Sequence, residues 1–131
     1  MLWRHGRTQW NAQRRFQGHS DIPLDDVGQA QAALAAPMLA SLKPSKIVSS
    51  DLQRARYTAQ ALADLTELDV GIDPQLRETF AGEWEGLGRE ELQERFGDEL
   101  AAWAAGSDLA PGGGERRSEV AFRMVEAIDR A

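Results

Sequence analysis

The segment close to the N-terminus combines the residue types that bind and attack a phosphoryl group. His5 offers an imidazole nucleophile, and the guanidinium of Arg4 beside it can donate to phosphate oxygens in a fixed, bidentate geometry. Gly6 lets the backbone turn tightly, while Thr8 and Asn11 add neutral hydrogen-bonding groups. Since arginine is almost never buried without a partner, these neighbours favour a catalytic histidine over one packed in the core.

Residues 4–11, in the order R-H-G-x-T-x-x-N, resemble the signature of the histidine phosphatase superfamily, which has the phosphoglycerate mutase-like fold. Further segments resemble that family in the same order along the chain: 17–24, 49–55, 76–86 and 111–115. Together these motifs cover nearly the whole sequence. The short stretch after Glu78 is more similar to the small bacterial phosphatases of the family than to its glycolytic mutases.

The resemblance implies a role for each matching residue. His5 attacks phosphorus through its neutral Nε2 and forms a phosphohistidine, while Glu78 serves as general acid and then as base toward water. The implied phosphate-binding residues are Arg4, Asn11 and Arg54, and the implied substrate-proximal residues are Arg7, Gln17 and Gly18. We expect the other ring nitrogen of His5 to donate to a backbone carbonyl, and nearby arginines to lower its pKa.

Two of these assignments depend on the resemblance alone. Helical geometry does not distinguish Arg54 from Arg56, and Glu78 has acidic neighbours at Glu83 and Glu85 that fit a solvated loop equally well. The match to Ser-Asp-Leu-x-Arg-Ala favours Arg54, and the match to Leu-Arg-Glu favours Glu78.

We expect neither a metal nor another cofactor. His19 and Asp21 are two potential metal ligands on one loop, but no third ligand follows at a zinc-like spacing. The glycines of 112–114 lack the Lys-Ser/Thr ending of a nucleotide-binding loop. Trp84 is expected to pack in the core.

Short apolar runs alternate with helical repeats and must position these side chains. The predicted strands end at Trp3 and cover 47–49 and 70–72. The predicted helices begin after a cap at Asp25, after a cap at Ser50 or Asp51, and at 90, 98 and 118. The first is expected to bury Val27, Ala30, Leu34 and Met38, and Pro37 is expected to kink it or end it near Ala36. This order predicts one α/β domain over 1–131, with a three-layer, mostly parallel sheet and helices on both faces.

The family pattern also includes a second histidine, on a turn after a strand that follows the late helix. The only other histidine here, His19, lies in an unrelated loop. We therefore expect the sequence to be truncated at both ends. The alternative is that the missing strand comes from another segment or from another chain, as in a homodimer.

The charge distribution is compatible with an anionic substrate. The net charge is −6, yet the first 20 residues contain four arginines and no acidic residue. A local positive site can attract an anion because salt screens distant carboxylates over about 10 Å. The acidic balance argues against nucleic acid, and no apolar run is long enough to span a bilayer. Charged Arg4 comes too early for a secretory signal, so we expect a cytoplasmic location, and the absence of cysteine is compatible with it.

The sequence thus predicts a hydrolase for a small phosphorylated metabolite, acting through a phosphohistidine. The alternatives are a phosphoglycerate-type mutase and a non-catalytic relative that binds phosphorylated ligands. The missing second histidine gives weight to the last of these.

Overall fold

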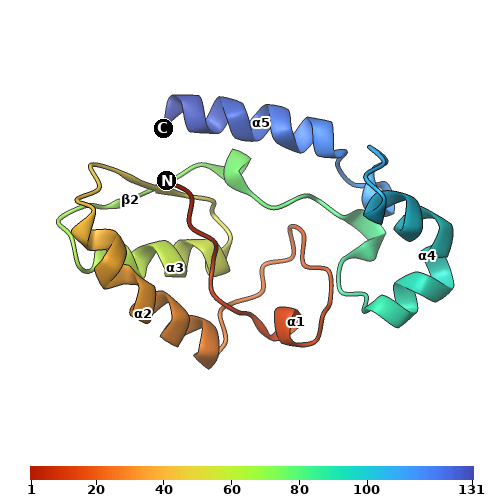
Figure 1. Ribbon diagram of the computed structural model, residues 1–131, viewed down its shortest axis with the longest axis horizontal. Coiled ribbons are helices and arrows are strands. Elements are labelled where there is room, and N and C mark those ends of the chain that lie inside the picture. Colours follow the sequence, from red (N-terminus) through yellow and green to blue (C-terminus); the bar gives the residue numbers. More distant parts are fainter.

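The computed structural model describes residues 1–131 and has the α/β architecture expected from the sequence (Figure 1). Strand β1 (Ile47–Ser49) and strand β2 (Val70–Ile72) lie parallel, with Ile47 opposite Val70 and Ser49 opposite Ile72. Helix α3 (Gln53–Ala63) connects them, as parallel neighbours require. This two-stranded unit is the whole sheet of the chain.

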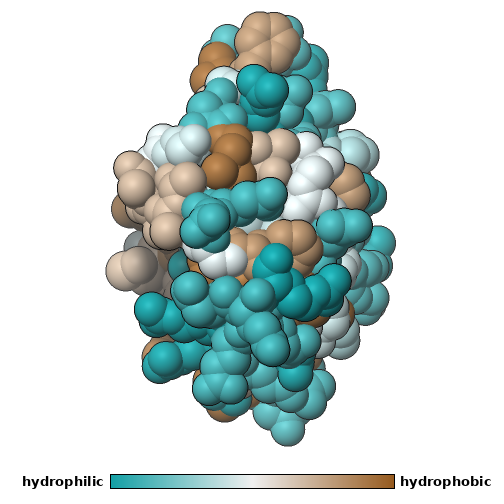
Figure 2. All heavy atoms as spheres, turned by 90° about the vertical axis from the view of Figure 1, so that its right-hand side faces the viewer, coloured by the Kyte–Doolittle hydropathy of each residue, from teal (hydrophilic) through white to brown (hydrophobic).

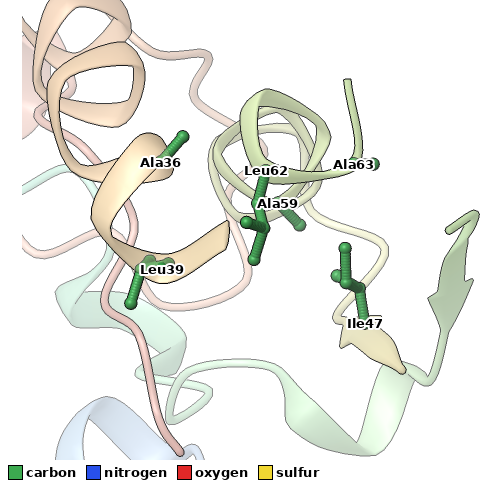
Figure 3. Packing of buried hydrophobic residues seen from close by; sticks show 6 residues of the cluster. All are labelled: Ala36, Leu39, Ile47, Ala59, Leu62 and Ala63. Atoms are coloured by element: carbon green, nitrogen blue, oxygen red, sulfur yellow. The ribbon is translucent and has the colours of Figure 1, made fainter. Parts of the chain in front are cut away.

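The main hydrophobic core lies where α2 (Asp26–Ser41) and α3 meet β1 (Figure 3). Helix α2 contributes Ala36 and Leu39, and β1 contributes Ile47. Helix α3 supplies the remaining residues of the cluster: Ala59, Leu62 and Ala63. Three of the six are alanines, so the two helices approach closely, and the packing fixes α3 relative to α2 and β1.

The predicted inward face and end of α2 are wrong, although its cap at Asp25 is confirmed. Leu34 is 85% exposed and Met38 is 65% exposed, whereas the buried positions of the helix are Gly28, Ala32, Ala36 and Leu39. Ala36 and Leu39 pack against α3 and β1, while Gly28 lies against the backbone of Arg7. The helix also continues through Pro37 to Ser41. Pro37 and the residue one turn before it are exposed, so water can satisfy the carbonyl that loses its hydrogen bond.

A second cluster joins α4 (Arg89–Ala104) to the short 3-10 turns η2 (Gly82–Trp84) and η3 (Pro111–Gly113). Its centre is Trp84, which is completely buried, so the expected packing role is confirmed. The two short helices predicted over 90–105 are confirmed, since α4 consists of two helical parts separated by a kink at Phe96, next to Gly97. The α4 side of the molecule is mostly hydrophilic, with small apolar areas between the polar groups (Figure 2).

Helix α5 (Arg117–Arg130) lies across the chain from α2 and α3 and packs against the turn η1 (Pro74–Leu76) that follows β2 (Figure 1). The strand predicted to end at Trp3 is not formed, because residues 1–7 have no neighbouring strand to pair with. The predicted caps of α3 are also wrong. Its N-terminal amide, on Gln53, instead donates to the carboxylate of Asp21 at 2.7 Å. No helix of the chain is both long enough and apolar enough to cross a membrane.

Candidate active site

The segment that carries His5 is held in place by α2 and α3. The amide of Gly6 donates to Oγ1 of Thr58 at 3.0 Å, and this hydroxyl donates in turn to the carbonyl of Arg54 at 2.7 Å. On the other side, Gly28 contacts the backbone so closely that a Cβ there would lie 2.0 Å from the carbonyl oxygen of Arg7. Glycine is therefore required at this contact, which fixes the backbone on both sides of His5.

Replacing Thr58 with valine should destabilise the protein by about 1–3 kcal/mol, because the buried amide of Gly6 would lose its only acceptor. Valine keeps the shape of threonine, so a packing defect does not contribute. Urea unfolding of the variant measures the loss, and Thr58→Ser, which keeps the hydroxyl, is the matched control. Equal stability of Thr58→Val and the parent protein would show that this hydrogen bond does not hold the segment.

The ring of His5 is oriented so that one nitrogen remains free. Its Nδ1 lies 2.6 Å from the carbonyl oxygen of Gly6, and since a carbonyl can only accept, Nδ1 carries the proton. Nε2 is then the unprotonated nitrogen. Burial lowers the pKa of His5 below its ordinary 6.5, and the positive charges of Arg54 and Arg4 add to this effect against the opposing influence of the Gly6 bond and Glu78. The expected direction is confirmed, but burial is the main cause rather than the arginines.

The imidazole of His5 should titrate with a midpoint below 6.5. Because the pKa is lowered, the ring stays neutral as the pH falls through 7 and gains its proton only in more acidic solution. Nuclear magnetic resonance of the ring nitrogens measures the midpoint, with the signal assigned by its absence from His5→Asn. Arg4→Ala should raise this midpoint, since it removes a nearby positive charge. A midpoint above 6.5 would contradict this account of the site.

Arg54 is the second residue of α3, in the first turn as expected, and only 2% of it is exposed. Its guanidinium donates to the carbonyl oxygens of Ser20 at 2.8 Å and Gly18 at 2.7 Å, but it has no carboxylate partner within salt-bridge distance. Burial lowers its pKa, which is the usual sign of a charge removed from water. The negative charges of Glu78, Asp21 and Glu85 oppose this shift, but none of them forms an ion pair with the guanidinium, which is therefore available to an anionic ligand.

The loop of residues 17–21 lies over Arg54 and is fixed by hydrogen bonds to Glu85. The Glu85 carboxylate accepts from the amide and hydroxyl of Ser20, both at 2.7 Å, and from the amide of Ala81 at 3.2 Å. Gly18 has a φ of +53°, and a Cβ there would lie 2.6 Å from the Glu85 carboxylate, so this position also needs glycine. Gln17 accepts from the hydroxyl of Thr8 at 2.5 Å, which leaves its amide nitrogen free to donate.

These groups meet at one pocket of about 260 Å³. Six of the residues expected at the site line it: Arg4, His5, Gln17, Gly18, Arg54 and Glu78. Its remaining wall includes Arg15 and two aromatic residues that the sequence did not single out, Phe16 and Trp103. Segments more than fifty positions apart in the chain therefore contribute to a single hollow, with the cationic groups and the imidazole among its lining.

Two expected residues lie outside that lining. Asn11 caps the short helix α1 (Gln9–Ala12), where its side-chain oxygen accepts from the amide of Thr8 at 3.0 Å. Arg7 pairs with Asp25 at 2.7 Å, next to the N-terminus of α2. The structure thus gives Asn11 a capping function and Arg7 an ion pair, and it does not bring either one to the pocket. Local hydrogen bonds to Thr8 and Asp25 determine both placements.

Glu78 lies in an irregular segment between η1 and η2, with an exposed side chain. One carboxylate oxygen accepts from the next amide, of Thr79, at 2.8 Å. The preceding residue, Arg77, forms a two-point ion pair with Asp51, which follows β1. This pair connects the Glu78 segment to the end of the strand beside Arg54. Sequence reasoning missed it, although both residues stand within motifs that drew attention.

The residues considered as metal ligands do not form a metal site. Nε2 of His19 donates to the carbonyl of Glu78 at 2.8 Å, while Asp21 bonds to Gln53 at the start of α3. Nowhere in the chain do three His, Asp or Glu side chains gather in a way that could hold an ion.

An α/β fold that brings a neutral imidazole and an unpaired, buried guanidinium to one pocket is typical of proteins that bind and transfer phosphoryl groups. Comparison with protein families agrees, since residues 1–131 match the model of the histidine phosphatase superfamily (branch 1). The chain belongs to this superfamily.

Several relatives within this superfamily are similar to the chain over almost its whole length. The glucosyl-3-phosphoglycerate phosphatase of Mycolicibacterium vanbaalenii is 43% identical over 128 residues, which are 98% of this chain and 57% of that protein. A probable phosphoglycerate mutase of Photorhabdus laumondii is 37% identical over 132 residues, covering 98% of this chain and 60% of its own length. The solved structure of a mycobacterial glucosyl-3-phosphoglycerate phosphatase in complex with VO3 superposes with a TM-score of 0.92 at 40% identity. That superposition covers 96% of this chain and 63% of the other. The chain thus spans somewhat more than half the length of these relatives.

Proposed function

We propose that the protein is a phosphomonoester hydrolase that acts through a phosphohistidine on a small phosphorylated metabolite. The observation that carries this proposal is the free Nε2 of His5, in a pocket shared with a buried Arg54 that forms no ion pair. A nucleophile and an unpaired cation at one site are suited to a dianionic phosphate ester.

The proposed reaction has two steps. In the first, Nε2 of His5 forms a bond to phosphorus, the bond from phosphorus to the ester oxygen breaks, and Glu78 gives its proton to the departing oxygen. In the second, Glu78 takes a proton from water, the water oxygen attacks phosphorus, and the bond to the histidine breaks. Arg4 and Arg54 hold the phosphoryl oxygens in both steps, where the charge on them is spread. Inorganic phosphate and the free enzyme result.

The relatives suggest which substrate to test first. Proteins named glucosyl-3-phosphoglycerate phosphatase are 42 to 43% identical to this chain, so we propose a glycosylated phosphoglycerate as the leading candidate. The wall formed by Phe16, Trp103 and Arg15 would face the part of such a substrate that does not react. The mutase remains the second candidate, because a probable phosphoglycerate mutase is also among the relatives. The cytoplasmic location and the homodimer expected from the sequence stay predictions.

Product analysis with the protein at its natural length tests the proposal. The phosphatase should release inorganic phosphate from labelled 3-phosphoglycerate or its glucosyl derivative into water, without added metal. A mutase would move the label to another carbon of the acid, and a binding protein would retain the substrate unchanged. Either of these results would replace the hydrolase with the corresponding alternative.

A further inference from the structure

The segment that carries Glu78 has no helix or strand of its own to hold it. Residues 77–81 are irregular, and the Glu78 side chain is exposed. General acid catalysis requires a carboxyl group within hydrogen-bond reach of the leaving oxygen, about 2.6–3.2 Å. Some other part of the molecule must therefore fix the backbone from which this carboxylate projects.

One guanidinium of α5 donates hydrogen bonds to several backbone carbonyls of this segment. Arg123 donates to the carbonyl oxygens of Gln75 at 2.6 Å, Arg77 at 2.7 Å and Glu78 at 3.0 Å. Its remaining donors form a two-point ion pair with Glu115, with both distances at 2.8 Å. Only 13% of the Arg123 side chain is exposed. Every N–H group of the Arg123 guanidinium therefore donates either to the backbone of the Glu78 segment or to the carboxylate of Glu115.

Glu115 and His19 complete the arrangement from two other directions. The amide of Phe80 donates to the Glu115 carboxylate at 2.8 Å, and the amide of Glu115 donates back to the carbonyl of Phe80 at the same distance. Arg123 lowers the pKa of Glu115, which keeps this carboxylate ionised. His19 donates to the carbonyl of Glu78 at 2.8 Å, and its ring lies against Phe80, with the two ring centres 5.3 Å apart.

We infer that Arg123 and Glu115 are positioning residues for Glu78, and that His19 assists them. They hold residues 75–80 from both sides, so that the carboxylate of Glu78 meets the leaving oxygen of a substrate bound at His5. This inference rests on the proposed hydrolase function. An ion pair that served stability alone would not need three backbone carbonyls of the segment that carries the acid. A displacement of about 1 Å at such a group can reduce a rate 10²-fold.

The test compares two substrates that differ in their need for an acid. The leaving group of p-nitrophenyl phosphate departs as a stable phenolate, whereas that of glycerol phosphate is a poor alkoxide that must be protonated. Arg123→Met should lower kcat for glycerol phosphate about tenfold more than kcat for p-nitrophenyl phosphate. Arg130→Met is the matched control, because Arg130 lies on the same helix and pairs with Asp73 at 2.9 Å without contacting residues 75–80. It should leave the ratio unchanged.

Further variants separate positioning from folding. Arg123→Lys keeps the charge but cannot serve three carbonyls and a carboxylate together, so it should show the same selective loss in a protein that still folds. In a Glu78→Gln background, Arg123→Lys should add no further selective loss, because the acid is already absent. Equal losses on both substrates, or a full additional selective loss in that background, would overturn the inference.

Amide hydrogen exchange makes the result independent of activity. Exchange at Thr79 and Phe80 should become faster in Arg123→Lys and remain unchanged in Arg130→Met. If the parent protein hydrolyses neither substrate, the proposed function fails, while the exchange rates still decide whether Arg123 holds the segment. Unchanged exchange in Arg123→Lys would refute the inference, even in an active phosphatase.

Discussion

His5→Ala is expected to lower the hydrolysis of p-nitrophenyl phosphate by at least about 10⁴-fold, because the variant has no atom that can form the bond to phosphorus. The buried Arg54 and the rest of the pocket remain, so phosphate binding should persist while turnover is lost. Steady-state kinetics measure the loss of turnover. Equilibrium binding of inorganic phosphate to the variant and to the parent protein measures whether phosphate binding persists. Retention of a rate within tenfold of the parent would remove His5 from the mechanism.

Two additional measurements show that the loss at His5 is chemical. Free imidazole should partly restore turnover in His5→Gly, because the small molecule can occupy the vacated site and accept the phosphoryl group. Gln9→Ala is a suitable control, since Gln9 is exposed and does not line the pocket. It should leave the rate unchanged, whereas an equal loss in both variants would indicate a general effect on this segment.

The parts of the site that the sequence could predict are those determined by short-range order. His5 follows directly from its neighbours in the chain, and the first-turn position of Arg54 follows from the short strand before it. The tautomer of His5 was also foreseeable, since its Nδ1 bonds to the carbonyl of the very next residue, Gly6. In each case the determining contact lies within a few residues.

The residues placed wrongly were those whose partners are distant or small. The inward face of α2 was assigned to Leu34 and Met38 because large apolar side chains usually supply the buried surface. Close approach of α3 and of the backbone at Arg7 reverses that preference, and the spacing of Gly28, Ala32 and Ala36 at every fourth position was the available signal. Small residues in such a row indicate a helix that contacts its neighbour at short range.

Polar contacts between residues far apart in the sequence could not be predicted from any local pattern. Arg123 lies 45 positions from Glu78, and Thr58 lies 52 positions from Gly6, yet each bonds to the backbone there. Neither residue type nor spacing distinguishes these side chains from ordinary surface positions on their helices. Only the packing of α3 and α5 against the rest of the chain reveals that the backbone around both proposed catalytic groups depends on them.

Arg54→Ala is expected to reduce kcat/KM by about 10²–10³-fold, the range found when one preorganised donor to a developing negative charge is removed. Two effects act together. The pocket loses its buried cation, and the carbonyls of Gly18 and Ser20 lose their donors, so the loop that covers the site becomes less ordered. Arg54→Lys should recover only part of the rate, because an ammonium has three donors rather than five and cannot bind a phosphate in the planar, bidentate geometry of a guanidinium.

The helix that carries Arg54 also provides its control. Arg56 lies two positions further along α3, is exposed, and contacts only the ring of Tyr57 among the aromatic side chains, at 5.4 Å from its centre. Arg56→Ala should therefore change kcat/KM by less than about twofold, as surface substitutions do. Weaker inhibition by inorganic phosphate in Arg54→Ala, but not in Arg56→Ala, would assign anion binding to the buried guanidinium. Equal inhibition in both variants would mean that the phosphoryl group binds elsewhere, because no other arginine of this pocket is buried to the same extent.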